Sequence, residues 1–338
     1  MKEKNLLGID SQDWTILKKI LSKYDATFYA FGSRTTDHAH KFSDLDLCVC
    51  GIQTLTDLRL ELTESDLPIK VDVHNIDELS SDFLKLIETD FILIQASKNF
   101  LISEKAILQY LQYIPGLIHQ IQRQQKATLI HGEDNMVCEM SDTTPSFIQN
   151  LIQESIAFFQ KNDFFLWVGP ATLPNGLEKI LKKNYSLKET IKYIVFLKTK
   201  NHIFKKEKSG INIIEAKKLS DFLPVLKNNN SRDFYKKITS IGILQKQRFF
   251  IAYEKDFPVA IGILYLENEN AVIQIYTEKH QQKELKNIII QYLVEVSEKE
   301  NIENIYMLAS ELHMDTQLGF TILGKISCLQ FLDLTHHQ

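Results

Sequence analysis

Cysteine is scarce in this chain, and its few positions form no recognisable pattern. Four cysteines occur among 338 residues, and no two of them stand in a Cys-x-x-Cys pair. Cys48 and Cys50 fall two residues apart on one predicted strand, where they share a face and cannot easily bridge. The spacing offers neither a disulfide framework nor a zinc site. A reducing compartment fits this pattern, so we expect a cytoplasmic protein.

Long apolar runs and an excess of one charge are also missing. No stretch approaches the length of a membrane span, and residues 1–4 lead into a predicted helix rather than a signal peptide. We therefore expect no membrane partner. The formal net charge of −4 provides no general basic field that would attract nucleic acid, but it does not exclude a local basic groove. At 338 residues the chain has room for two or three globular domains.

A glycine–serine turn follows an apolar strand early in the sequence. Residues 28–31 form the strand, and Gly32-Ser33 is the usual break between a buried strand and a helix start. Backbone N–H groups at a helix start bind phosphate, and glycine lets the backbone come close to it. The turn therefore predicts a site for an anionic partner.

Three carboxylates follow on two further predicted strands. Alternation along residues 44–49 puts Asp44 and Asp46 on one face of the first strand, and Asp72 lies on the polar side of the strand 69–74. Crowded carboxylates repel one another unless a cation joins them. Magnesium takes oxygen ligands from carboxylates and fills its shell with water and substrate phosphates. These residues therefore predict a magnesium site.

The spacing of these residues resembles a known signature. Gly32-Ser33, ten further residues and then Asp44-Leu45-Asp46 is similar to the pattern of the polymerase-β-like nucleotidyltransferase superfamily. The flanking residues look like the minimal nucleotidyltransferases, a family that includes antitoxin partners of HEPN-domain toxins, and the resemblance covers residues 1–98. It implies a nucleotidyltransferase fold and magnesium-dependent transfer of a nucleoside monophosphate from a nucleoside triphosphate, with ATP favoured, to an acceptor hydroxyl.

The resemblance also implies a role for each residue of the motif. Asp44 and Asp46 would hold metal, and Asp72 would complete the metal site and act as base on the acceptor. Gly32 and Ser33 would hold the triphosphate.

Arg34 and Ser43 are further candidates for nucleotide binding. Two interpretations of Arg34 stay open: it could reach a phosphate, or it could pair with a carboxylate as structural support. Lys41 and Lys70 flank the acidic residues and could either neutralise them or meet substrate.

Apolar periodicity predicts helices over residues 11–24, 54–65 and 80–90, with Asp10 as the N-cap of the first. The second has capping-box spacing at its start. Residues 99–128 are predicted to be a helical linker, because apolar residues recur there at three- and four-residue steps. Further elements are expected as strands near 163–170, 193–197, 211–217 and 305–309 and as helices near 177–185 and 221–227.

The rest of the chain resembles the GNAT acetyltransferase fold over residues 129–335. The resemblance rests on a hairpin over 249–266, a strand over 272–277 and a long helix over 283–300 that follows it. The expected fold class is α/β (α+β), a nucleotidyltransferase fold followed by a GNAT-like mixed sheet in two halves. We divide the chain into residues 1–98, a linker 99–128, an N-terminal GNAT-like half 129–205 and a C-terminal GNAT-like domain 206–338.

The GNAT-like region departs from its family where coenzyme A would bind. The family's glycine-rich turn, whose backbone amides hold the pyrophosphate, aligns with residues 281–286, where Gln281 and Lys283 are the nearest candidates for acyl-CoA contact. Both glycines are lost there, and Glu284 would set a carboxylate against a phosphate. The family's general-acid tyrosine is matched by Asp315. We therefore expect a degenerate module and no acetyl-CoA.

Three functions follow from these resemblances. The first is a nucleotidyltransferase whose GNAT-like region positions the acceptor, which is a protein, an RNA or a small molecule. The second is a non-catalytic, antitoxin-like protein that binds a partner toxin. The third is an acyl-CoA-dependent acetyltransferase with an accessory nucleotidyltransferase domain.

Overall fold

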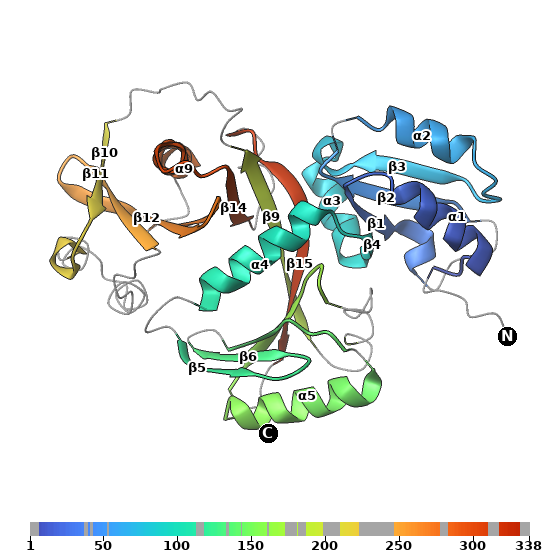
Figure 1. Cartoon of the computed structure of the whole chain (residues 1–338), viewed down its shortest axis with the longest axis horizontal. Coiled ribbons are helices and arrows are strands. Elements are labelled where there is room, and N and C mark those ends of the chain that lie inside the picture. The colour runs from blue at the N-terminus through green and yellow to red at the C-terminus, as the bar shows by residue number, and fades with distance from the viewer. Residues whose placement is uncertain are drawn as a thin grey trace.

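The protein is described from a computed structural model, which shows a mixed α/β chain with two sheets in its described parts (Figure 1). No helix among the residues described is both long enough and apolar enough to cross a bilayer. The structure describes residues 7–36, 40, 43–52, 54–112, 118–132, 135–142, 144–160, 162–172, 181, 187–198, 210–222, 247–277, 283–309 and 318–331.

The N-terminal sheet has four strands in the order β3-β2-β1-β4. The strands β1 and β2 are antiparallel, β2 and β3 are parallel, and β4 joins the free edge of β1. The first three were predicted, whereas β4 is an additional strand of four residues. The bounds are β1 Thr27–Phe31, β2 Leu45–Cys50, β3 Val71–Asn75 and β4 Ile92–Gln95.

The predicted helices of this domain are present, and their caps explain where they begin. The side chain of Asp10 accepts a hydrogen bond from the backbone N–H of Gln12 at 3.0 Å, which confirms the predicted N-cap. The prediction of a capping box was wrong, because Leu55 occupies the N-cap and makes no side-chain bond. The bounds are α1 Ser11–Leu21, η1 Gly32–Thr35, α2 Thr56–Thr63, η2 Ile76–Glu78, α3 Ser81–Ile87 and η3 Glu88–Asp90.

Both faces of the N-terminal sheet are covered over β1, where all five residues are buried. One face packs Phe28 and Ala30 with apolar residues of α1 and α2. The other face, which includes Tyr29, belongs to a core that continues into the rest of the chain. Alternation along the strand therefore divides its residues between two cores.

The predicted helical linker over 99–128 is a helix only in its first part. Helix α4, Lys98–Gln112, confirms that part. The second part was wrong, because Ile118–Arg123 is strand β5, which pairs antiparallel with β6, Thr128–Gly132. A short apolar run fits helix and strand periodicity alike, and pairing with a neighbouring strand decides between them.

The second sheet has eleven strands, β10-β11-β12-β13-β14-β9-β15-β8-β7-β6-β5 in spatial order. The hairpin, the strand after it, the long helix and the strand near 305–309 were all predicted and are confirmed as β11, β12, β13, α9 and β14. The remaining bounds are β7 Met136–Cys138, α5 Pro145–Phe158, β8 Phe164–Val168, β9 Lys188–Lys198, β10 Ile211–Ala216, η5 Leu219–Phe222, β11 Gln247–Glu254, β12 Phe257–Glu267, β13 Asn270–Thr277, α9 Lys283–Lys299, β14 Asn304–Ala309 and β15 Thr321–Phe331.

Some elements of this region were not predicted, and some predictions fall on residues without a description. Strands β6 and β7 and helix α5 had no counterpart in the predictions. The helix expected over 177–185 lies outside the described residues except for Leu181, and most of that over 221–227 does so as well. The same holds for Asp315.

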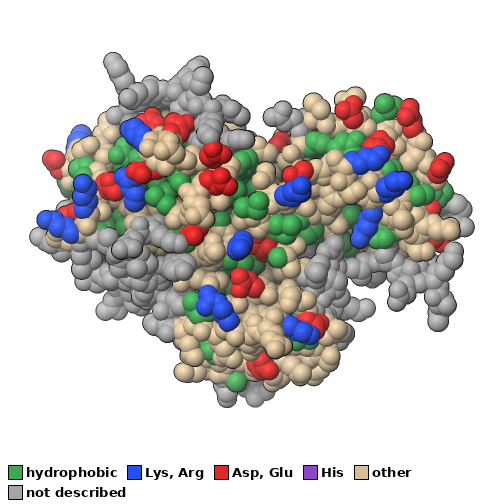
Figure 2. Space-filling model, in the orientation of Figure 1, with side chains coloured by type: hydrophobic (Ala, Val, Ile, Leu, Met, Phe, Trp, Pro, Cys, Tyr) green, Lys and Arg blue, Asp and Glu red, His purple; other side chains and the backbone are tan. Residues whose placement is uncertain are grey.

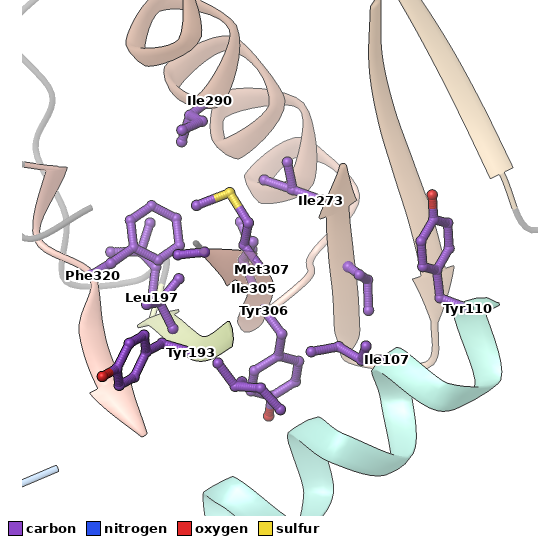
Figure 3. Packing of buried hydrophobic residues seen from close by; sticks show 14 of the residues in the cluster. Ile107, Tyr110, Tyr193, Leu197, Ile273, Ile290, Ile305, Tyr306, Met307 and Phe320 are labelled. Atoms are coloured by element: carbon purple, nitrogen blue, oxygen red, sulfur yellow. The ribbon is translucent and has the colours of Figure 1, made fainter. Parts of the chain in front are cut away.

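Helices α4 and α9 cover opposite faces of this sheet. Gly262 of β12 faces Leu293 of α9. Tyr265, an odd number of residues along the strand, has its ring 5.8 Å from the ring of Tyr110 of α4 and tilted against it. Figure 3 shows the same division two strands further along the sheet, where Tyr306 of β14 points toward α4 and Met307 points toward α9. Helix α4, which directly follows the N-terminal domain, is thus part of the second core.

The two regions are joined by buried polar contacts as well as by packing. The backbone N–H of Lys325 in β15 donates to the hydroxyl of Tyr29 in β1 at 2.8 Å. The ammonium of Lys325 donates to the carbonyl of Glu88 at 2.7 Å, and the hydroxyl of Tyr193 in β9 donates to the carboxylate of Glu88. Buried polar groups need such partners, so these bonds fix one orientation of the two regions.

Candidate active site

The glycine–serine turn has a backbone that only glycine adopts easily. Strand β1 ends at Phe31, and Gly32 has φ +74° at the start of η1. A Cβ atom at Gly32 would lie 2.5 Å from Oδ2 of Asp46, which is closer than real Cβ contacts come. Both the conformation and the space therefore require glycine at this position. The turn is in direct contact with one of the predicted metal ligands.

Asp46 occupies the centre of the site. In the strand register it lies opposite Phe31 on one side and opposite Asp72 on the other. Its side chain is half-buried, and its pKa is raised, first by burial and then by the charge of Asp72. The predicted closeness of these two carboxylates is therefore present, and the charge of Asp72 disfavours ionisation of Asp46.

Asp44 and Asp72 occupy more exposed positions. Asp44 is exposed just before β2, and the backbone N–H of the next residue, Leu45, donates to the carbonyl of Lys70 at 2.9 Å. The ammonium of Lys70 donates to Oδ2 of Asp72 at 2.6 Å, and this bond raises the pKa of Lys70. Of the two roles open to Lys70, neutralising the acidic residues is the one that these contacts favour.

The three predicted carboxylates are ligands of the kind that magnesium prefers, but in this structure their oxygens do not surround a common position. Among the residues described, no three Asp, Glu, His or Cys side chains lie close enough together to hold a metal ion. Asp72 is directed to Lys70, and Asp44 is exposed. All three candidates still offer carboxylate oxygens at one end of one sheet face. Burial is the main cause of the raised pKa of Asp46, and the charge of Asp72, which a cation would neutralise, adds to it. The chemistry of the residues therefore fits the predicted metal.

The other predicted nucleotide-binding residues differ in their exposure. Ser33 is exposed on the turn. Ser43 is half-buried, and its hydroxyl accepts from the backbone N–H of His40 at 2.9 Å. Arg34 is buried, and its guanidinium donates to backbone carbonyls rather than projecting from the turn. Lys41 lies outside the described residues.

One site residue was missed by the sequence predictions. His74 is two residues beyond Asp72 on β3, so it shares the face of the carboxylates, and its ring lies 5.7 Å from that of Phe31. It is close enough to Asp46 for its charge to oppose the rise in that residue's pKa. The alternation that identified Asp72 applies equally to His74 and could have found it.

The residues proposed for acyl-CoA are only partly described. Gln281 lies outside the described residues, and Lys283 begins α9 without a described side chain. Glu284 is exposed in the first turn of that helix. On the face drawn in Figure 2, basic side chains are interspersed with acidic and apolar ones, and the described residues of this face form no continuous basic stripe.

The fold and the site define the class of the protein. A family model described as a nucleotidyltransferase domain matches residues 14–100. The chain is also 40% identical, over 100 residues, to the "Probable protein adenylyltransferase MntA" of Haemophilus influenzae, a match that spans 28% of this chain and 88% of that protein. The chain therefore belongs to the nucleotidyltransferase family, and it is an enzyme that transfers a nucleoside monophosphate.

Solved structures are similar to the remainder of the chain. A GCN5-related N-acetyltransferase from Kribbella flavida is 10% identical with a TM-score of 0.49, covering 67% of this chain and 93% of that one. A tandem GNAT protein from the clavulanic acid biosynthesis pathway is 11% identical with a TM-score of 0.46, covering 68% and 87%.

Proposed function

We propose that this chain is a magnesium-dependent adenylyltransferase that moves AMP from ATP to a hydroxyl group of a protein. The observation that carries the proposal is Asp46, which lies against Gly32 of the turn and opposite Asp72 of the next strand. A phosphate-binding turn and paired carboxylates are the parts that phosphoryl-type transfer requires, since it depends on positioning and charge neutralisation. The choice of AMP and of a protein acceptor follows the Haemophilus influenzae relative, which is named as a probable protein adenylyltransferase.

Each residue of the motif has a place in this reaction. Backbone N–H groups of Gly32 and Ser33 bind the triphosphate. Asp44, Asp46 and Asp72 would hold magnesium, which when bound neutralises charge on the phosphates. The acceptor oxygen then forms a bond to the α-phosphorus while the bond to pyrophosphate breaks, and the acceptor's proton passes to Asp72. For that step Asp72 must lose the hydrogen bond that it accepts from Lys70 in this structure.

The C-terminal region is proposed to position the acceptor. Asp46, Cys48 and Cys50 alternate onto one face of β2, and the two cysteines pack into the core shared with that region. The region therefore begins within a few residues of the carboxylates, at the place from which an acceptor would approach. Acyl transfer receives no comparable support, because Glu284 stands exposed in the first turn of α9.

The proposal is tested by comparing Asp46→Asn with the wild-type chain, using radiolabelled ATP, CTP, GTP and UTP with and without magnesium. Loss of a metal-binding carboxylate should reduce label transfer to protein by on the order of 10³-fold, with the fold retained by circular dichroism. Asp66→Asn is the matched control, because Asp66 is exposed in the loop before β3. Undiminished transfer by Asp46→Asn, or transfer that ignores magnesium, would contradict the proposal.

A further inference from the structure

Arg34 is buried immediately after the glycine–serine turn, with 3% of its surface exposed. A buried guanidinium is costly unless its N–H groups have partners. Its Nε donates to the carbonyl of Ser43 at 2.8 Å, and its Nη1 donates to the carbonyl of Leu7 at 3.1 Å. Burial lowers the pKa of Arg34, and the nearby charge of Asp44 opposes this change. These groups therefore bind the protein itself.

The two carbonyls belong to segments that meet at the site. Ser43 directly precedes Asp44, so the bond from Nε ties the turn to the first metal ligand. Leu7 is buried in the core under the sheet, so the bond from Nη1 anchors the arginine to the body of the domain. The backbone N–H of Leu45 in turn donates to the carbonyl of Lys70, which lies two residues before Asp72. This bond links the segment that carries Asp44 to the strand that carries Asp72.

We infer that Arg34 is a positioning residue of the nucleotidyltransferase site, which holds Asp44 at a fixed place relative to the Gly32-Ser33 turn and does not bind substrate phosphate. The inference rests on the proposed function for its catalytic consequence. Lysine cannot replace this arginine, because one ammonium on a flexible stem cannot reach two carbonyls in the directions that a planar fork reaches.

The experiment compares Arg34→Lys, which keeps the charge, and Arg34→Gln, which keeps one donor group, with wild type. The matched control is Arg59→Lys, because Arg59 also donates to a backbone carbonyl, that of Val73 at 2.7 Å, but from α2. Three quantities are measured: kcat for AMP transfer, the Kd of a non-hydrolysable ATP analogue in magnesium, and amide hydrogen exchange over residues 43–46.

A positioning role predicts that both Arg34 variants lose about 10²-fold in kcat, the effect of a small misplacement of a catalytic group. It also predicts an analogue Kd within about threefold of wild type and faster exchange at 43–46, with Arg59→Lys near wild type in kcat. A Kd weakened by about tenfold or more with kcat retained at saturation would make Arg34 a phosphate ligand and overturn the inference.

Two remaining outcomes are also decisive. If the wild-type chain transfers nothing, the proposed function fails, and the exchange data still decide whether Arg34 orders residues 43–46. If neither Arg34 variant folds, the arginine serves the whole domain rather than the site, and the inference is overturned.

Discussion

The two ends of one sheet face have opposite characters. Along β2, the side chains of Asp46, Cys48 and Cys50 point to the same side of the sheet. At the outer end, Asp46 is half-buried beside Gly32 and Asp72. At the inner end, both thiols are completely buried, and burial raises the pKa of each, so neither is a nucleophile at neutral pH.

The difference shows how one strand serves two purposes. A carboxylate buried beneath the C-terminal region would carry a large desolvation penalty. The charged residues therefore lie at the end of the sheet face that the described part of this region does not cover. The apolar end is covered by β15, which contacts β2 and η2. The residues proposed for catalysis and those that dock the C-terminal region are thus neighbours on one face, and substitutions should separate the two roles.

Among the substitutions that separate the two ends of the face, Gly32→Ala should have the largest effect, and it should act on the outer end only. Its Cβ would meet Oδ2 of Asp46 at 2.5 Å, so the carboxylate must move. We expect AMP transfer to fall by about 10²-fold, measured as kcat/KM with the acceptor. The left-handed backbone should cost about 1 kcal/mol of stability in addition.

Gly51→Ala is the control that separates the effect of contact with Asp46 from the effect of backbone strain. Gly51 has φ +82°, yet a Cβ there would meet nothing within 4 Å. It should lose similar stability and keep its activity. Equal loss of activity in both variants would show that backbone strain in this domain, rather than contact with Asp46, disables the enzyme.

Tyr29→Phe should act on the inner end. It removes the hydroxyl that receives the backbone N–H of Lys325 and leaves that buried group without this partner. We expect a loss of about 2 kcal/mol in the free energy of unfolding, with transfer activity within about twofold of wild type.

Chemical denaturation measures this loss, and Tyr24→Phe is the control. The hydroxyl of Tyr24 bonds Glu61 on the helix side of the sheet, where solvent can replace it, so its removal should cost less. A Tyr29→Phe enzyme as inactive as Gly32→Ala would mean that the two ends of the face do not act separately.

The smallest expected effect is a pH dependence of stability that arises within the C-terminal region. Glu104 of α4 is buried, and it accepts from the indole of Trp167 at 2.9 Å and from the backbone N–H of Ala171 at 3.0 Å. Burial raises its pKa to about 7 from 4.5. Because the folded state then binds more protons than the unfolded state between these values, the free energy of unfolding should fall as pH rises from 4.5 to 7.

Between pH 6 and 7 this contribution should be on the order of 1 kcal/mol. It is measured as the difference between wild type and Glu104→Gln in urea unfolding across that range, since the amide does not titrate. A difference that stays constant with pH would show that Glu104 is ionised in the folded state throughout.

Local patterns predicted the site better than they predicted its surroundings. Alternation predicts that Asp46 and Asp72 each lie on the polar face of their strand, because side-chain direction is fixed by neighbours in sequence. The pairing of β2 with β3 then brings them side by side. The partners of Arg34 escaped prediction, since Leu7 lies 27 residues before it and meets it only through the fold. Strand β5 was misread because its apolar spacing suits either structure until β6 pairs with it.

The bond between Tyr29 and Lys325 spans 296 residues, which sets an order of events during synthesis. The catalytic sheet leaves the ribosome early, but the strand that covers its inner end is made far later. Until β15 arrives, the buried cysteines of β2 lie on an open apolar surface. Contacts of such long range form slowly and leave partly made chains prone to association. The nascent nucleotidyltransferase domain therefore exposes this apolar surface while the rest of its own chain is being translated.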